Sequence, residues 1–271
     1  MAHPIERLRW AARHDGDGPR LAGLQAVRAL AGFAGDPAGL VTACRRLVQR
    51  QPAMAPVWWA AARMLVTPDP PFAEAATAES SLVDDRTGVA VAHQLDALLP
   101  DGGTALVVGP PWYSGDALVG RGDIVILAAD TPAGYGLARA LQSADVDALS
   151  VPDAGVGAAA AHVDLVIIDA TAVSAEGVIA ASGARAAAAV ARAAGRPILV
   201  GAGAGTVLPT RLWEALRSAL DAAGDSWDAE FEFVPLDLVD TIAGPSGALA
   251  AVRASARADC PVAPELLRPL T

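Results

Sequence analysis

The sequence predicts an α/β protein: an N-terminal helical bundle over residues 1–100, followed by a Rossmann-like parallel sheet with flanking helices over residues 101–271. In the first hundred residues, apolar side chains recur at helical spacing. From residue 104, short apolar runs without polar alternation are separated by helical patterns, as is typical of parallel strands covered on both faces. Apolar residues make up 53% of the chain and aromatic residues only 4%, so the core is expected to consist mainly of Ala, Val and Leu.

The helices of the first part have readable starts and stops. Residues 19–33 carry an apolar stripe that begins with Leu21 and Leu24. Gly35, Asp36 and Pro37 end this helix and begin the next, with Asp36 predicted as its N-cap and Pro37 at its first position. Further helices are expected over residues 37–48, 56–65 and 87–99.

The second part alternates between strands and helices. Strands are expected at residues 105–108, 123–127, 148–151, 163–168, 198–201 and 229–233, and helices at 133–142, 155–161, 182–194 and 211–223. Right-handed crossovers bring the carboxyl ends of parallel strands to one edge of the sheet, where ligands bind in such folds.

Charge and composition exclude several functions. The net charge of −10 and the pI near 4.8 argue against direct nucleic-acid binding and against an anionic membrane surface. Neither the two cysteines nor the four histidines show metal-ligand spacing, so we expect no metal and no cofactor. Charged residues interrupt the longest apolar stretches, and no secretory signal is evident. The sequence therefore predicts a cytoplasmic protein without a membrane span.

Three aspartates at predicted strand ends are candidates for acid–base chemistry: Asp130, Asp153 and Asp169. The alternative is that they cap the following helices, which we favour for Asp130 and Asp153. Asp169 directly follows the apolar run 163–168 and is expected near the floor of a cleft. Asp169 and Asp153 are therefore the weak catalytic candidates.

Two loops are candidate ligand contacts. Gly201 and Gly203 follow a strand and would let a phosphate approach the backbone, although a plain tight turn is the favoured explanation. Their late position and the loop that follows argue against a dinucleotide site. Residues 109–115 follow the first strand, and here Tyr113 and Ser114 are predicted ligand contacts. A rigid loop with Trp112 as an aromatic plug is the open alternative.

A resemblance to a known family is carried by four segments: Val163-Asp-Leu-Val-Ile-Ile-Asp-Ala-Thr171, Ala175-Glu-Gly-Val-Ile179, Ser182-Gly183 and Gly195-Arg-Pro-Ile-Leu-Val200. They resemble the alpha, beta and delta subunits of eukaryotic initiation factor 2B. The same family includes methylthioribose-1-phosphate isomerase and ribose-1,5-bisphosphate isomerase. The segment from Val234 to Asp240 resembles a downstream motif of the family. The resemblance implies a homodimer, a phosphorylated small-molecule ligand, and ligand contacts at Thr171, Ser182 and Gly183.

The departures from the family pattern affect its chemistry. The isomerases use a cysteine in the loop after the first strand, where this chain has Gly109 and Pro110. Thr171 stands where they have an acid. Ala180 and Ala181 stand where they have an Asn-Lys pair, and alanine can neither donate to a sugar hydroxyl nor neutralise a phosphate.

These departures predict an initiation factor 2B-like protein that is non-catalytic. We expect it to bind a sugar-phosphate or nucleotide-like ligand, or a protein partner. The alternative is an aldose–ketose isomerase for phosphorylated sugars that uses substituted residues, namely Asp169, Asp153 and Ser114.

Overall fold

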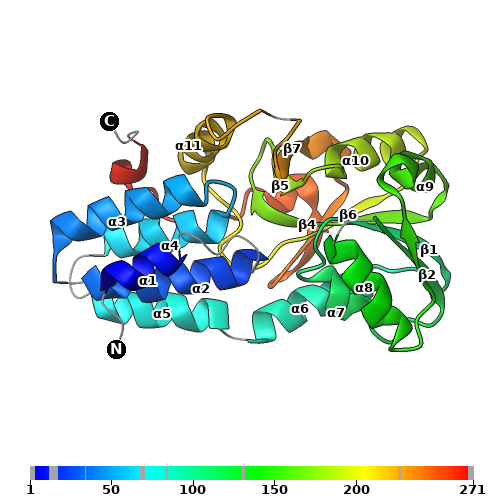
Figure 1. The fold of residues 1–271 in the computed structure, drawn as a ribbon, viewed down its shortest axis with the longest axis horizontal. Helices are drawn as coiled ribbons and strands as arrows, with labels where there is room; N and C mark the ends of the chain where they lie inside the picture. The colour runs from blue at the N-terminus through cyan, green and yellow to red at the C-terminus, as the bar shows by residue number, and fades with distance from the viewer. Residues whose placement is uncertain are drawn as a thin grey trace.

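The computed structural model describes residues 4–11, 18–33, 35–67, 71–83, 85–129, 132–225 and 227–267. The N-terminal part consists of α1 (Pro4–Ala11), α2 (Gly18–Leu30), η1 (Ala31–Phe33), α3 (Pro37–Arg50), α4 (Ala55–Val66), α5 (Pro71–Val83) and α6 (Asp85–Asp96). Helices α1 to α5 form a bundle at one end of the molecule, and α6 leads from it to the sheet (Figure 1).

The four expected helices are present, although α6 begins and ends earlier than expected, and α1 and α5 were not predicted. Asp36 is the N-cap of α3, where its Oδ1 accepts a hydrogen bond of 2.9 Å from the N–H of Gly39, and Pro37 begins the helix. Helix α4 is apolar on nearly all sides, with residues 55–62 buried, as expected for a helix at the centre of a bundle. None of the helices described is both long and apolar enough to span a membrane.

The second part is built on a mixed, mostly parallel sheet. Its strands are β1 (Gly103–Val108), β2 (Ile124–Ala129), β3 (Ala148–Val151), β4 (Leu165–Val173), β5 (Gly177–Ala181), β6 (Ile198–Gly201), β7 (Phe231–Pro235), β8 (Thr241–Gly244) and β9 (Gly247–Ala250). The order is β3-β2-β1-β4-β6-β8-β9, with β5 and β7 added beside β4. All strand pairs up to β8 along this order are parallel. The predicted fold class is confirmed.

Three features of the sheet differ from the prediction. Strand β4 does not end at residue 168 but continues to Val173, because its second half pairs antiparallel with β5. Asp169 therefore lies within a strand rather than after one. Strand β5 pairs antiparallel with β7, and β8 and β9 form a hairpin that was not predicted.

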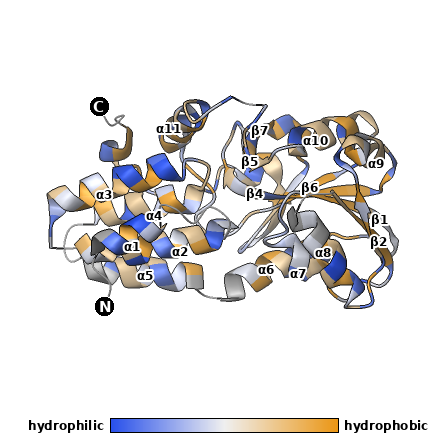
Figure 2. Cartoon of the chain, viewed as in Figure 1, coloured by the Kyte–Doolittle hydropathy of each residue, from blue (hydrophilic) through white to orange (hydrophobic). Residues whose placement is uncertain are grey.

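Helices cover the sheet on both faces. They are α7 (Ser114–Leu118), α8 (Pro132–Gln142), η2 (Asp153–Gly155), α9 (Val156–His162), α10 (Ala184–Ala193), α11 (Thr210–Asp221), η3 (Leu236–Leu238), α12 (Ala251–Ala254) and η4 (Pro264–Leu267). Helix α10 packs on β4, β6 and β7, α8 packs on β2 and β3, and α6 packs on β6, β8 and β9. Figure 2 shows apolar residues along β1 and β2, whereas α3 carries hydrophilic residues on the surface in view.

The core of the helical bundle includes residues from the end of the chain. Trp213 and Leu216 of α11, together with Cys260 and Leu266, are buried in the same apolar cluster as the helices α2 to α4. Burying such large side chains contributes about 1.5–3 kcal/mol each. The bundle is thus closed by segments that follow the sheet in the sequence.

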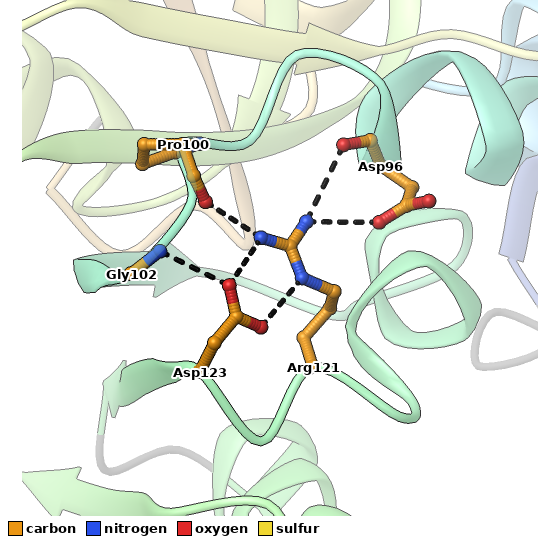
Figure 3. A network of polar contacts seen from close by, with 5 residues as sticks. All are labelled: Asp96, Pro100, Gly102, Arg121 and Asp123. Atoms are coloured by element: carbon orange, nitrogen blue, oxygen red, sulfur yellow. Dashed lines mark hydrogen bonds and ion pairs between the residues drawn. The ribbon is translucent and has the colours of Figure 1, made fainter.

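At the amino-terminal edge of the sheet, a polar network joins helix and strands (Figure 3). Arg121 donates to both carboxylate oxygens of Asp123 at 2.8 Å, to Asp96 Oδ1 at 2.9 Å and to the carbonyl of Pro100 at 2.6 Å. Asp123 also accepts a hydrogen bond from the N–H of Gly102. Hydrogen bonds from Arg121 lower the pKa of Asp123 far below its usual value. The network fixes the end of α6 against the starts of β1 and β2.

Candidate functional site

The carboxyl ends of β1, β4 and β6 lie side by side and bring the predicted residues Asp169 and Gly201 together. Asp169 in β4 pairs with Gly201 in β6, one step beyond the pair of Val108 with Ile168. A Cβ atom on Gly201 would overlap Oδ1 of Asp169. Glycine is therefore required at position 201 by the buried carboxylate beside it.

Asp169 is held by the loop that follows β1. Its Oδ2 accepts hydrogen bonds from the N–H of Tyr113 at 2.7 Å, the N–H of Ser114 at 3.0 Å and the hydroxyl of Ser114 at 3.1 Å. The N–H groups of Tyr113 and Ser114 belong to the start of α7, so the carboxylate caps this short helix from another part of the chain. The side chain of Asp169 is buried, with 4% of the residue exposed.

Two effects act on the pKa of Asp169 in opposite directions. Burial disfavours the charged form, whereas the three hydrogen bonds from Tyr113 and Ser114 favour it. Burial is the larger effect, and Oδ1 has no hydrogen-bond partner among the described residues. The pKa of Asp169 is therefore raised to about 6.

The loop of residues 109–115 fills the space between the sheet edge and the bundle. Tyr113 is buried, and a Cβ atom on Gly203 would overlap its hydroxyl group. Trp112 contacts Gly18 at the start of α2 and stacks on Phe231 with ring centroids 6.3 Å apart. Burial, followed by the charge of Asp169, raises the pKa of the Tyr113 hydroxyl. These contacts favour the aromatic plug over an open ligand-binding loop.

The three positions that depart from the isomerase pattern meet in space. Gly109 contacts Ala181, because a Cβ atom on Gly109 would lie 2.7 Å from Cβ of Ala181. Thr171 lies in the irregular part of the β4–β5 pairing, and its hydroxyl donates to the carbonyl of Ile179 at 3.3 Å. Ala180 pairs with Ala170 in the same ladder. The groups gathered here are small or already hydrogen-bonded.

Other predicted residues lie elsewhere. Ser182 is exposed and its hydroxyl donates to the carbonyl of Ala229, whereas Gly183, with φ of +94°, begins α10. Asp153 follows β3, which is three strand spacings from β4, roughly 14 Å. It therefore cannot share a reacting centre with Asp169. The capping role favoured for Asp153 is wrong, since α9 has Gly155 at its N-cap.

The candidate residues that remain are accounted for briefly. Asp130 lies outside the described residues. Within the described part of the chain, no three His, Cys, Asp or Glu side chains are grouped closely enough to hold a metal ion. Cys44 and Cys260 are free and buried, and burial raises the pKa of both thiols. Neither is placed as a nucleophile.

Sequence reasoning missed the surroundings of the Gly201–Gly205 loop. The hairpin of β8 and β9 stands beside this loop, with Pro245 and Ser246 in its turn, and a cavity lies between the two. The signal was present, because Gly244-Pro-Ser-Gly247 between two apolar runs is typical of a hairpin turn.

The fold and the strand-end arrangement define a class of protein, a helical bundle joined to a Rossmann-like sheet whose strand ends face the bundle. Residues 122–219 match the Initiation factor 2 subunit family, IF-2B. No curated protein matches the chain significantly. The match and the shared fold confirm the resemblance to the initiation factor 2B and isomerase family.

Solved structures share this fold at low sequence identity. The translation initiation factor eIF-2B of Pyrococcus horikoshii OT3 is 16% identical, with a TM-score of 0.74 over 94% of this chain and 99% of the other. The tetrameric eIF2B-beta2-delta2 complex of C. thermophilum is 18% identical, with a TM-score of 0.73 over 93% of this chain and 92% of the other. The 5-methylthioribose 1-phosphate isomerase of Pyrococcus horikoshii OT3 is 16% identical, with a TM-score of 0.62 over 93% of this chain and 86% of the other.

Proposed function

We propose that this chain is a non-catalytic relative of the initiation factor 2B subunits that binds a small phosphorylated molecule. The family resemblance includes both translation factors and a sugar-phosphate isomerase. The choice between them rests on the strand ends. This chain has Gly109 where the isomerases have a cysteine, and Thr171 where they have an acid.

One observation carries the proposal: the strand-end position is filled by the protein itself. Oδ2 of Asp169 is occupied by three donors from Tyr113 and Ser114, and Trp112 closes the space toward the bundle. A sugar phosphate would have to displace this loop before reaching Asp169. Near-attack geometry needs reacting atoms within about 3–3.5 Å, which the filled site does not offer.

Assembly and location are part of the proposal. We expect a homodimer in the cytoplasm, supported by the tetrameric complex with which the fold is shared and by two unpaired cysteines. Val252 on α12 is 74% exposed and Val89 on α6 is 61% exposed, and α6 and α12 both lie at the β8–β9 end of the sheet. Light scattering on the full chain at micromolar concentration tests this, and a monomer would refute the dimer.

An activity screen tests the absence of catalysis. The chain is incubated with 5-methylthioribose 1-phosphate and ribose 1,5-bisphosphate, and ketose formation is followed by NMR, with a 5-methylthioribose 1-phosphate isomerase as the positive control. We expect no turnover. A thermal-shift screen with pentose phosphates and nucleoside monophosphates runs in parallel, and at least one compound should raise the melting temperature.

One observation favours the isomerase alternative. Asp169 has an unpaired oxygen and a pKa raised to about 6, which are properties of a general acid–base group. Turnover that disappears in Asp169→Asn but persists in Asp153→Asn would establish this alternative and overturn the non-catalytic proposal.

A further inference from the structure

A cavity of about 230 Å³ lies on the side of the Gly201–Gly205 loop that faces the β8–β9 hairpin. Its walls are the loop residues 202–205 and 207 on one side and the hairpin turn 244–247 on the other. Arg257 and Asp259, which follow α12, complete the rim. Because β6 and β8 are parallel, the cavity lies at their carboxyl ends, the edge where α/β sheets bind ligands.

The opposite side of the same loop is closed. The ring of Trp59 from α4 lies against Gly205, where a Cβ atom would be 3.0 Å from its Cγ. The hydroxyl of Tyr113 lies against Gly203. The hydroxyl of Thr206 donates to the carbonyl of Gly203 at 2.7 Å and fixes the turn. Among the described residues, Trp59 and Tyr113 therefore cover the side of this loop that faces away from the hairpin.

The loop presents backbone donors that the protein does not use. The N–H of Ala202 donates to Ala243 and that of Leu208 to Val173, which are the last ladder bonds on either side. Between them, the N–H groups of Ala204 and Gly205 donate to no acceptor among the described residues. Gly205 is buried, and nearly all buried N–H groups in proteins find a partner. A partner from outside the protein is therefore expected beside them.

Charge selects the kind of partner. Arg257 is exposed at the rim and makes no ion pair with any residue that the structure describes. Its guanidinium is a planar set of donors that matches the oxygens of a phosphate. Asp259, two residues further on, lines the same cavity and can only accept hydrogen bonds when ionised. A cation and an acceptor at one small cavity suit an anion that carries hydroxyl groups.

The geometry points to a binding site for a small phosphate monoester in this cavity. The N–H groups of Ala204 and Gly205 and the guanidinium of Arg257 hold the phosphate, and Asp259 accepts a hydrogen bond from a hydroxyl of the attached sugar. The volume lies below the ~300–1,000 Å³ of pockets for drug-sized ligands, so the site fits one sugar phosphate and not a dinucleotide. This inference rests on the proposed function and names the site for it.

Isothermal titration of the full chain tests the site. The probes are ribose 5-phosphate, inorganic phosphate and ribose, and the variants are Arg257→Gln, Asp259→Asn and the control Arg253→Gln. Arg253 is also exposed and lies on α12, but it does not line the cavity. Loss of one charged hydrogen-bond partner should weaken ribose 5-phosphate binding by roughly 10- to 100-fold in Arg257→Gln. Arg253→Gln should bind like the unmodified chain.

The other probes separate the parts of the site. Asp259→Asn should weaken ribose 5-phosphate but leave inorganic phosphate unchanged, and ribose alone should not bind. In NMR spectra, ribose 5-phosphate should shift the amide signals of Ala204 and Gly205. Binding that Arg257→Gln leaves unchanged refutes this site while the proposed function stands. If no probe binds and the thermal-shift screen finds no ligand, the proposed ligand binding fails as well.

Discussion

The clearest consequence of the structure is a pH dependence of stability that comes from Asp169. The folded state raises the pKa of Asp169 from 3.8 to about 6, so the folded protein binds a proton more tightly than the unfolded chain. A raised acid pKa makes the protein more stable as the pH falls from above 6 toward 4. The full difference of about 2.2 pKa units corresponds to about 3 kcal/mol.

Replacing Asp169 with Asn removes this titration while keeping an acceptor for Tyr113 and Ser114. The free energy of unfolding should therefore differ between the two proteins by an amount that depends on pH. Between pH 7.5 and pH 5, the unmodified chain should gain about 1 kcal/mol relative to Asp169→Asn. The interval just below pH 5 is avoided, because a net charge near zero at the pI of 4.8 favours precipitation.

Urea unfolding at several pH values measures this difference, with Asp153→Asn as the control because Asp153 is exposed. The reasoning is refuted if the stability difference between the unmodified chain and Asp169→Asn stays constant, or grows as the pH rises. A constant difference would mean that the hydrogen bonds from Tyr113 and Ser114 offset the burial of the carboxylate, and a difference that grows with pH would mean that they outweigh it.

Two further substitutions test the packing and the network at opposite edges of the sheet. Gly203→Ala should lower the free energy of unfolding by about 1–3 kcal/mol, because its methyl group would overlap the hydroxyl of Tyr113. The control is Gly136→Ala on the exposed side of α8, where the added methyl group meets nothing within 4 Å and should raise the free energy of unfolding by ~0.5–1 kcal/mol. Equal effects of the two substitutions in thermal melts would refute the close packing of Tyr113 against Gly203. Asp123→Asn should lower the melting temperature at pH 7, since it removes the negative charge beside Arg121 and one of the two oxygens that accept from Arg121 and Gly102. This loss should shrink as the pH falls below 3.8, because the folded pKa of Asp123 is lowered, and a loss that persists in acid would contradict that cause.

Local signals were sufficient to predict much of the fold. The cap at Asp36 and the buried run that became β1 are set by neighbouring residues, so the sequence shows them directly. Strand β5 was not predicted, because it forms by pairing with β7, about fifty residues later in the chain. The end of β4 was missed for the same reason, since its last residues are held by β5. Pairings of this kind depend on distant partners rather than on local pattern.

The candidate site was predictable by position but not by environment. The sequence placed Asp169 and Gly201 at the carboxyl ends of two predicted strands, and the structure pairs the two residues. It could not show that Tyr113 and Ser114 would take one carboxylate oxygen, because those residues lie 55 and 56 positions earlier. The cavity beside Gly205 depends on how a hairpin packs, which no residue pattern specifies.

The filled strand ends and the open cavity are two sides of one packing arrangement. Glycine is needed at positions 201 and 203 because Asp169 and Tyr113 occupy the space where their side chains would lie. The loop of residues 109–115 is packed against β4, where Tyr113 and Ser114 donate to Asp169. Gly109 and Ala181, which depart from the isomerase pattern, lie in contact at the start of this loop. The proposed ligand binding uses the face of the loop that Trp59 and Tyr113 leave open, toward the β8–β9 hairpin.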